Sequence, residues 1–253
     1  MNVVIGTPIY RNGAYAIDKF LSNQEEIQRT YPASELVLAT SENDFFGELE
    51  GLVRSSGLRA TIFHYGFVKP DYARSNLWDI AGGREAIRKY VLSQTQARYM
   101  LFLDADMTFD PSVIATMERE IQGYDAVFSG YPLHQSGIGL AGAGCVMLTR
   151  SILEKLEFRC YEFRNGEVIF EDNVLEMDLF RLGSRVKKGF FVAISHYSSP
   201  TEARYIVPQP LGLARKLANN ALVRYALLRA SIMIQRNIPW KLKILLNKFI
   251  IPT

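Results

Sequence analysis

The sequence is poor in cysteine, with two in 253 residues. Cys145 and Cys160 form neither a Cys-x-x-Cys pair nor a metal-ligand cluster, and such sparse usage favours a reducing, intracellular compartment. No run of about 18 uncharged apolar residues occurs, so no membrane-spanning helix is expected. The first residues lack the charged start and long apolar stretch of a signal peptide and are typical of a strand. We therefore expect a cytoplasmic protein.

Charge is distributed unevenly along the chain. The net charge is +3, and 48% of the residues are hydrophobic, which suits one large α/β domain or a domain with an appendage. Residues 201–253 hold nine Lys or Arg and one acid, or +8, which leaves 20 basic and 25 acidic residues, or −5, in the rest. This asymmetry predicts two parts with different partners, a larger domain over residues 1–200 and a basic amphipathic helical segment over 201–253.

Strand-like and helix-like patterns alternate over the first half of the chain. Strands are expected at residues 2–6, 36–39, 60–64 and 99–103, with helices at 14–29 and 76–92 between them. This alternation predicts a mostly parallel central sheet with helices on both faces. Further strands are expected at 126–128, at 158–163 and 168–170 flanking an Asn-Gly turn, and at 190–194.

Two carboxylates end the most apolar of these strands. Asp104 and Asp106 follow the run of residues 99–103 directly. Each desolvated carboxylate needs a partner, and a divalent cation such as Mg²⁺ or Mn²⁺ is one that prefers hard oxygen ligands. Ligands also bind at the carboxyl ends of strands in open α/β sheets. The pair is therefore a candidate metal–diphosphate site, although a solvated turn at a strand end gives the same pattern.

Several other features follow one another in a definite order. Thr7-Pro8-x-Tyr10-Arg11 ends the first strand, and an acidic loop with Glu42 follows the second. A basic helix with Arg84 precedes the Asp-x-Asp strand, and a glycine-rich strand, a Glu-Asp pair and His196 come after it. The ordered set resembles the nucleotide-sugar-dependent glycosyltransferases of the GT-A fold. In particular it resembles the large inverting family with Asp-x-Asp and Glu-Asp motifs, over residues 1 to about 200.

The resemblance implies roles for individual residues. It implies that Asp106 and His196 bind a manganese or magnesium ion, with Asp104 on the ribose or on a metal-bound water. It implies a donor pocket formed by Thr7, Pro8, Tyr10, Arg11, Glu42, Arg84, Asp104 and Ala105. Asp172 matches the catalytic base, and the residues that position acceptor or donor are Gly142, Ala143, Gly144 and Glu171. The implied reaction is metal-dependent transfer of a hexose from a UDP or GDP sugar to a hydroxyl or phosphate acceptor, with inversion.

The residues leave several alternatives open. The loop Thr-Ser-Glu-Asn-Asp at 40–44 departs from the family pattern, so the nucleobase is not fixed. Arg84 is equally compatible with a solvent-facing helix position, His196 with an ordinary partly buried histidine, and Glu171 and Asp172 with acids that offset a helix dipole. A retaining transferase, a nucleotidyltransferase on a related sheet and a non-catalytic sugar-nucleotide or carbohydrate-binding module are the competing functions.

The last part of the chain mixes basic and aliphatic residues. Over 211–251 Arg and Lys alternate with Leu and Ile, and Pro239-Trp240 interrupts the pattern. Basic amphipathic helices of this kind suit a membrane surface rich in anionic lipid, and packing on the domain or in a dimer is the alternative. We expect membrane-surface association and a lipid-linked acceptor. Nucleic acid is not expected as a partner, because stacking aromatics are not interleaved with the basic residues.

Overall fold

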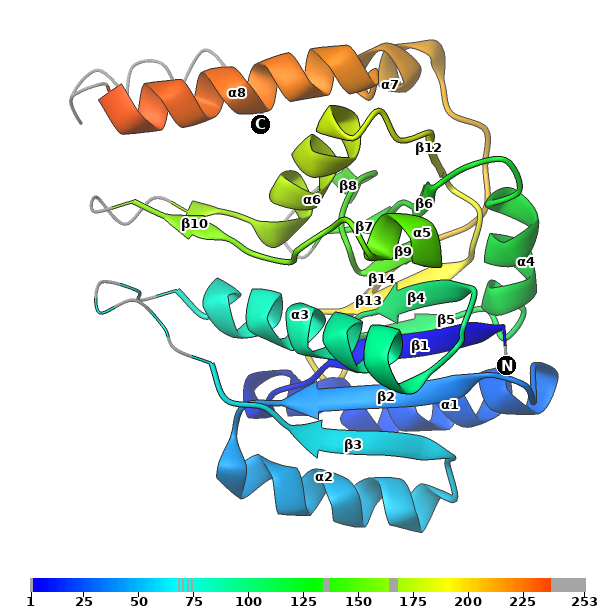
Figure 1. Cartoon of the computed structure of the whole chain (residues 1–253). Coiled ribbons are helices and arrows are strands. Elements are labelled where there is room, and N and C mark those ends of the chain that lie inside the picture. Colours follow the sequence, from blue (N-terminus) through cyan, green and yellow to red (C-terminus); the bar gives the residue numbers. More distant parts are fainter. Residues whose placement is uncertain are drawn as a thin grey trace.

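A seven-stranded sheet forms the centre of the protein. The computed structural model describes residues 2–237 apart from 68, 70, 72, 74, 134–136 and 164–167. The strand order is β12-β6-β9-β4-β1-β2-β3 (Figure 1). The strands are β1 (Val3–Pro8), β2 (Glu35–Thr40), β3 (Ala60–His64), β4 (Tyr99–Leu103), β6 (Ala126–Ser129), β9 (Cys145–Thr149) and β12 (Val186–Gly189). Every neighbouring pair is parallel except the two that include β9, so the predicted mostly parallel sheet is confirmed.

Helices cover both faces of this sheet, because its strands are apolar on both sides. Val3 and Ile5 of β1 pack in one core, and Val4 packs in the other. The first core is completed by α1 (Ile17–Thr30), α2 (Asn43–Ser56) and α4 (Val113–Glu120). The second is completed by α3 (Leu77–Gln94), α5 (Arg150–Leu153) and α6 (Glu171–Arg181). A 3₁₀ helix, η1 (Arg11–Ala16), follows β1.

Helix α3 crosses β1 closely enough to require a glycine. A Cβ on Gly83 would lie 2.6 Å from the Tyr10 hydroxyl oxygen and 2.7 Å from Pro8 Cβ. The glycine that weakens the helix interior therefore permits the close approach of α3 to the end of β1. This approach brings Arg84, the next residue, over the carboxyl ends of the central strands.

The remaining strands of the described residues form three smaller sheets. The first has the order β14 (Ala203–Ile206), β13 (Ile194–Tyr197) and β5 (Met107–Phe109). The other two are the hairpins β7 (Tyr131–Pro132) with β8 (Ile138–Gly139), and β10 (Tyr161–Glu162) with β11 (Val168–Ile169). The predicted pairing across the Asn-Gly segment is thus confirmed, while the turn at 164–167 lies outside the described residues.

One sequence prediction needs correction. The strand expected at 190–194 is wrong, because β12 ends at Gly189 and β13 begins at Ile194. Phe190 and Val192 are buried between them and fill the core without a strand ladder, so their apolar pattern reflects packing. The domain boundary expected at residue 200 stays a prediction. Residue 200 lies between β13 and β14, which pair with each other, and the first C-terminal helix begins at Leu213.

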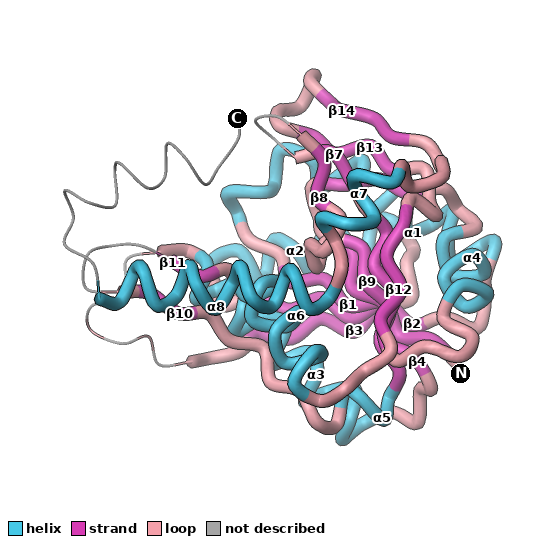
Figure 2. Tube along the Cα trace, turned by 90° about the horizontal axis from the view of Figure 1, so that it is seen from above, coloured by secondary structure: helices cyan, strands magenta, loops and turns pink. Residues whose placement is uncertain are grey.

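The C-terminal helices lie against α6. They are α7 (Leu213–Ala218) and α8 (Ala221–Asn237), and α8 lies alongside α6 in both views (Figures 1 and 2). The Phe180 ring stacks on Tyr225 with centroids 4.4 Å apart. Residues 238–253 of the predicted amphipathic segment lie outside the described residues. No helix in the described ranges is long and apolar enough to cross a bilayer.

Candidate active site

A cavity of about 460 Å³ opens at the carboxyl ends of β1 and β4, the end where ligands bind in open α/β sheets. Residues from the end of β1, the turn after β4, helix α3, the start of α6 and strand β13 meet there. The predicted residues that line it are Pro8, Tyr10, Arg84, Asp104, Ala105, Asp106, Glu171, Asp172 and His196. Residues separated by up to 188 positions in the sequence are thus gathered around one space.

Backbone and side-chain hydrogen bonds shape the turn that carries both aspartates. The Thr7 hydroxyl donates to the carbonyl oxygen of Leu103, the last residue of β4, at 2.7 Å. The Asp104 amide donates to the Gly144 carbonyl at 3.1 Å. The end of β4 is therefore tied to the end of β1 and to the segment before β9. Thr7 is fully buried behind the turn, so its observed contact is with the backbone of the strand.

Arg84 joins two sides of the cavity. Its guanidinium donates to Asp104 Oδ1 at 2.5 Å and to Glu171 Oε1 at 2.6 Å. The side chain is 2% exposed, so the solvent-facing alternative is wrong. Burial opposes the charge, but the two carboxylates outweigh it and raise the pKa of Arg84. Burial also raises the pKa of Glu171, with Arg84 acting in the opposite direction. One buried cation thus holds the β4 turn and the start of α6 together.

His196 faces Asp106 across the cavity. Its Nδ1 lies 2.5 Å from the Pro132 carbonyl oxygen, which only accepts, so Nδ1 is the protonated nitrogen. The other nitrogen, Nε2, lies 3.3 Å from Asp106 Oδ2. Burial lowers the pKa of His196. The hydrogen bond with Asp106 and its negative charge together have a larger effect in the other direction, so the pKa of His196 is raised above its usual value. A neutral ring would turn its lone pair toward a carboxylate oxygen, an arrangement that calls for a proton or a cation between the two atoms.

This donor pair fits a divalent metal. No group of three His, Cys, Asp or Glu in the described ranges is placed to hold an ion. Magnesium-type sites on nucleotides often use one or two protein carboxylates and take their other ligands from phosphates and water. The hydrogen bond from Nδ1 to Pro132 orients the ring in the way that metal-binding histidines usually require. Asp106 and His196 therefore suit an ion that a diphosphate helps to hold.

The start of α6 places two acids at the cavity wall. Asp172 accepts a hydrogen bond from the Asn173 amide at 2.6 Å. Burial, with the adjacent charge of Glu171 as the next cause, raises the pKa of Asp172 to about 7. An acid that only offsets a helix dipole would have a lowered pKa. The raised pKa of Asp172 is therefore compatible with a carboxyl group that accepts a proton.

Other predicted site residues lie away from the cavity lining. Arg11 pairs with Glu48 at 2.9 Å, and its amide donates to Glu42 at 2.7 Å, so Arg11 and Glu42 form a polar edge at η1 and the N-terminus of α2. Residues 142–144 are buried beneath Tyr131. A Cβ on Gly142 would lie 1.9 Å from the Tyr131 hydroxyl oxygen. Their glycines, with Ala143 between them, allow the close approach of this ring.

Sequence reasoning missed two aromatic residues at or near the site, Tyr131 and Tyr65. Tyr131 packs edge-to-face on His196 with centroids 5.8 Å apart, and burial together with Asp104 and Asp172 raises its pKa well above the usual value. Tyr10 and Tyr65 both donate to the Asp79 carbonyl, at 2.5 and 2.6 Å. One signal was available, since Tyr131 follows the end of the predicted strand at 126–128, where ligand-facing residues are expected.

Three solved structures show what the fold is similar to. S. aureus TarS 1-349 in complex with UDP-GlcNAc matches with a TM-score of 0.56 and 12% identity, covering 95% of this chain and 77% of that one. The mannosyltransferase PcManGT from Pyrobaculum calidifontis in complex with GDP-Man and Mn²⁺ matches at 0.52 and 12%, covering 74% and 54%. The inositol-1-phosphate CTP transferase from T. maritima matches at 0.50 and 12%, covering 79% and 90%.

These identities support a likeness of fold. No family model and no curated protein matches the chain. The α/β fold of the GT-A type, with its mostly parallel sheet, is the fold class predicted from the sequence and is confirmed. A likeness of fold does not assign roles to the individual residues of the cavity.

Proposed function

We propose that this protein is a nucleotide-sugar-dependent glycosyltransferase that transfers a hexose to a hydroxyl or phosphate acceptor. The observation that carries the proposal is the Asp104–Arg84–Glu171 bridge. It places the acids of the β4 turn and the acid pair of α6 on one cavity, which is the arrangement that donor binding and acceptor activation need. The solved neighbours with UDP-GlcNAc and with GDP-Man support a donor of this class.

A divalent metal, manganese or magnesium, is part of the proposal. Asp106 and His196 would hold it. Asp104, the other acid of the same turn, would contact the ribose or a metal-bound water. Bound there, the ion supplies a positive charge that stabilises the leaving diphosphate. Mn²⁺ accompanies GDP-Man in the mannosyltransferase neighbour. The fixed Nδ1 proton of His196 supports this assignment, because it presents Nε2 to the space beside Asp106.

The donor would lie along the end of β1. Pro8, Tyr10 and Ala105 line the cavity there, and apolar and aromatic surfaces are what a nucleoside needs on its faces. Arg11 and Glu42 form the polar edge beside this position. The preference for a donor with uracil or with guanine would then depend on the polar groups of that edge.

Asp172 is the proposed general base. A hydroxyl acceptor is a weak nucleophile at neutral pH, and a carboxylate with a pKa of about 7 accepts its proton effectively. Glu171, held by Arg84, fixes the position of the helix end that carries Asp172. Attack by the acceptor on the side opposite the leaving diphosphate gives inversion. A phosphate acceptor is already ionised and needs no base, so Asp172 would then orient the acceptor. A lipid-linked acceptor agrees with the basic C-terminal part of the chain.

Replacement of Asp172 by Asn tests the role of the base. Transfer to a hydroxyl acceptor should fall by about 10²- to 10⁴-fold, while the dissociation constant of the donor stays within about two-fold. Asp178→Asn is a matched control on the same helix, because Asp178 pairs with Arg159 at 2.6 Å and does not line the cavity. Equal turnover in Asp172→Asn and Asp178→Asn would remove the base assignment. Proton NMR of the product anomer separates inversion from retention.

A nucleotidyltransferase is the second candidate function. The structural match to the inositol-1-phosphate CTP transferase from T. maritima favours it. Such an enzyme would release pyrophosphate from a nucleoside triphosphate, whereas a glycosyltransferase releases a nucleoside diphosphate from a sugar nucleotide. Analysis of the released nucleotide and phosphate distinguishes the two. Binding of a sugar nucleotide without any product would instead identify a binding module.

A further inference from the structure

The outer face of α8 is unusually apolar for a surface helix. We define this outer face by six exposed residues, Leu222, Val223, Ala226, Leu227, Ala230 and Met233. Leu222 is 64% exposed, Leu227 56% and Met233 60%. The outward side of a surface helix normally carries polar and charged residues. In α7, Leu213 and Leu217 are exposed to a similar degree, so the apolar character extends over both helices.

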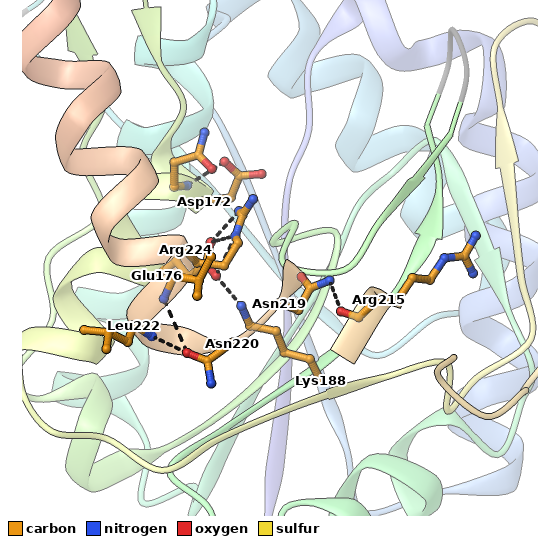
Figure 3. Close-up of polar contacts among 10 residues, drawn as sticks. Asp172, Glu176, Lys188, Arg215, Asn219, Asn220, Leu222 and Arg224 are labelled. Atoms are coloured by element: carbon orange, nitrogen blue, oxygen red, sulfur yellow. Dashed lines mark hydrogen bonds and ion pairs between the residues drawn. The ribbon is translucent and has the colours of Figure 1, made fainter. Parts of the chain in front are cut away.

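The opposite edge of α8 is already used for packing. Arg224 donates to both carboxylate oxygens of Glu176, at 2.6 and 3.1 Å, and Lys188 pairs with the same carboxylate (Figure 3). Tyr225 stacks on Phe180. Glu176 is one turn after Asp172 in α6, and both appear together with Arg224 in Figure 3. The helix is therefore fixed to the protein by one edge, and its outer face is directed away from the domain.

The charges near the outer face have one sign. Residues 213–237 contain no Asp or Glu, and Arg215, Lys216 and Arg229 are exposed among the apolar side chains. The remainder of the chain before residue 201 carries −5. An apolar face bordered by basic residues is complementary to a bilayer that contains anionic lipid. A second copy of this chain would bring another basic surface against it, which disfavours that partner.

We propose that the outer face of α8, together with Leu213 and Leu217, lies in the interface of an anionic lipid bilayer. The helices would lie parallel to the membrane plane, with the apolar side chains in the acyl boundary and the arginines and lysines at the headgroups. The Arg224–Glu176 pair then holds the catalytic domain at the membrane. This inference specifies the membrane contact of the proposed function and is independent of the reaction that the cavity performs.

Vesicle cosedimentation of the full chain tests this surface. Wild type should bind phosphatidylcholine vesicles that contain about 30% phosphatidylglycerol at least ten-fold more tightly than pure phosphatidylcholine vesicles. The triple variant Leu222→Glu, Leu227→Glu, Met233→Glu should lose at least about 100-fold in affinity, because apolar burial is replaced by repulsion from the anionic surface. Val207→Glu, at a residue 48% exposed outside α7 and α8, is the matched control and should bind like wild type.

A pair of charge variants tests the electrostatic contribution to vesicle binding. Arg229→Glu should weaken binding to the anionic vesicles by about 25-fold, since each basic residue near the surface contributes roughly five-fold and the reversal counts twice. Arg29→Glu, at an exposed position in α1, makes the same change in net charge and should have little effect. Equal losses in the two variants would show that only net charge matters and would overturn the assignment of this face.

Three results would contradict the proposal. The first is no binding of wild type to the anionic vesicles. The second is unchanged binding by the triple variant, with circular dichroism and melting temperature confirming that all variants are folded. The third is a stable dimer in analytical ultracentrifugation that the triple variant dissociates, which would assign the face to a second copy. Nucleotide binding by the same samples is measured in parallel, so that failure of the surface is distinguished from failure of the proposed transferase site.

Discussion

Removal of Arg84 should strongly destabilise the protein, because this side chain neutralises two acids inside the fold. Arg84→Met keeps most of the apolar stem but leaves Glu171, whose side chain is 8% exposed, without its cation. Asp104 is 28% exposed and is partly hydrated, so Glu171 accounts for most of the cost. Breaking a buried ion pair by removing one partner typically costs about 3–5 kcal/mol. For a domain of this size, that corresponds to a fall of roughly 6–20 °C in Tm.

Thermal unfolding of a small set of variants measures this effect. Lys89→Met is the control on the same helix, because Lys89 is 70% exposed and its pair with Glu85 spans 3.6 Å; its Tm should change by less than about 3 °C. The double variant Arg84→Met, Glu171→Gln should recover about 1–3 kcal/mol relative to Arg84→Met, since no buried charge is then stranded.

The pH dependence gives an independent check of the same variant. Without Arg84, the folded-state pKa of Glu171 rises further above its unfolded value. The loss of stability caused by the unpaired Glu171 carboxylate is then present above that pKa. It disappears as the pH falls and Glu171 takes up a proton. The stability difference between wild type and Arg84→Met should therefore be smaller near about pH 5 than near about pH 8. A Tm change below about 3 °C at both pH values would refute the assignment of Arg84 as the central cation.

Three further predictions concern Asp172, the glycine-rich segment and α8. Because the base must be deprotonated and the pKa of Asp172 is about 7, turnover should be constant above that pH and fall about ten-fold per unit below it; a rate independent of pH between about 5 and 8 would contradict this. Gly142→Ala should displace Tyr131 and cost about 1–3 kcal/mol, whereas Gly51→Ala, with no atom within 4 Å of its Cβ, should be neutral or stabilising in the same melting assay. Arg224→Leu should speed amide hydrogen exchange in α8 relative to wild type, and unchanged protection would show that the ion pair does not hold this helix.

Most of the central sheet was predictable because its strands have a strong local signal. The run at 99–103 is apolar on both faces, and strands of this kind are buried in parallel sheets. The run at 190–194 has similar composition, yet Phe190 and Val192 serve the core as an irregular segment. Short apolar runs specify burial more reliably than they specify hydrogen bonding. The long-range pairing of β13 with β14 and β5 has no local signal, so this small sheet could not be predicted from the sequence.

Part of the candidate site was also visible in the sequence. Asp104 and Asp106 are recognisable because they end a buried strand, and Glu171 and Asp172 because they begin a helix. The sequence also contained a signal for the burial of Arg84, which was missed. This residue lies on the apolar stripe of α3 with Ile87 and Val91, three and seven residues further on. A cation in such a stripe needs buried anions as partners. The contacts of Tyr131 with His196 and Gly142 depend on the tertiary fold alone.

Thermal-shift titration with nucleotides and Mn²⁺ tests the central claim most directly. UDP, GDP and their common sugar conjugates are compared on wild type and on Asp106→Ala, each with and without the metal. A nucleotide at about 100 times its dissociation constant should stabilise wild type by roughly 2.7 kcal/mol. We expect a shift for one base that requires Mn²⁺ and is lost in Asp106→Ala. Absence of a shift with every nucleotide, or an equal shift in Asp106→Ala, would contradict a metal-dependent sugar-nucleotide site in this cavity.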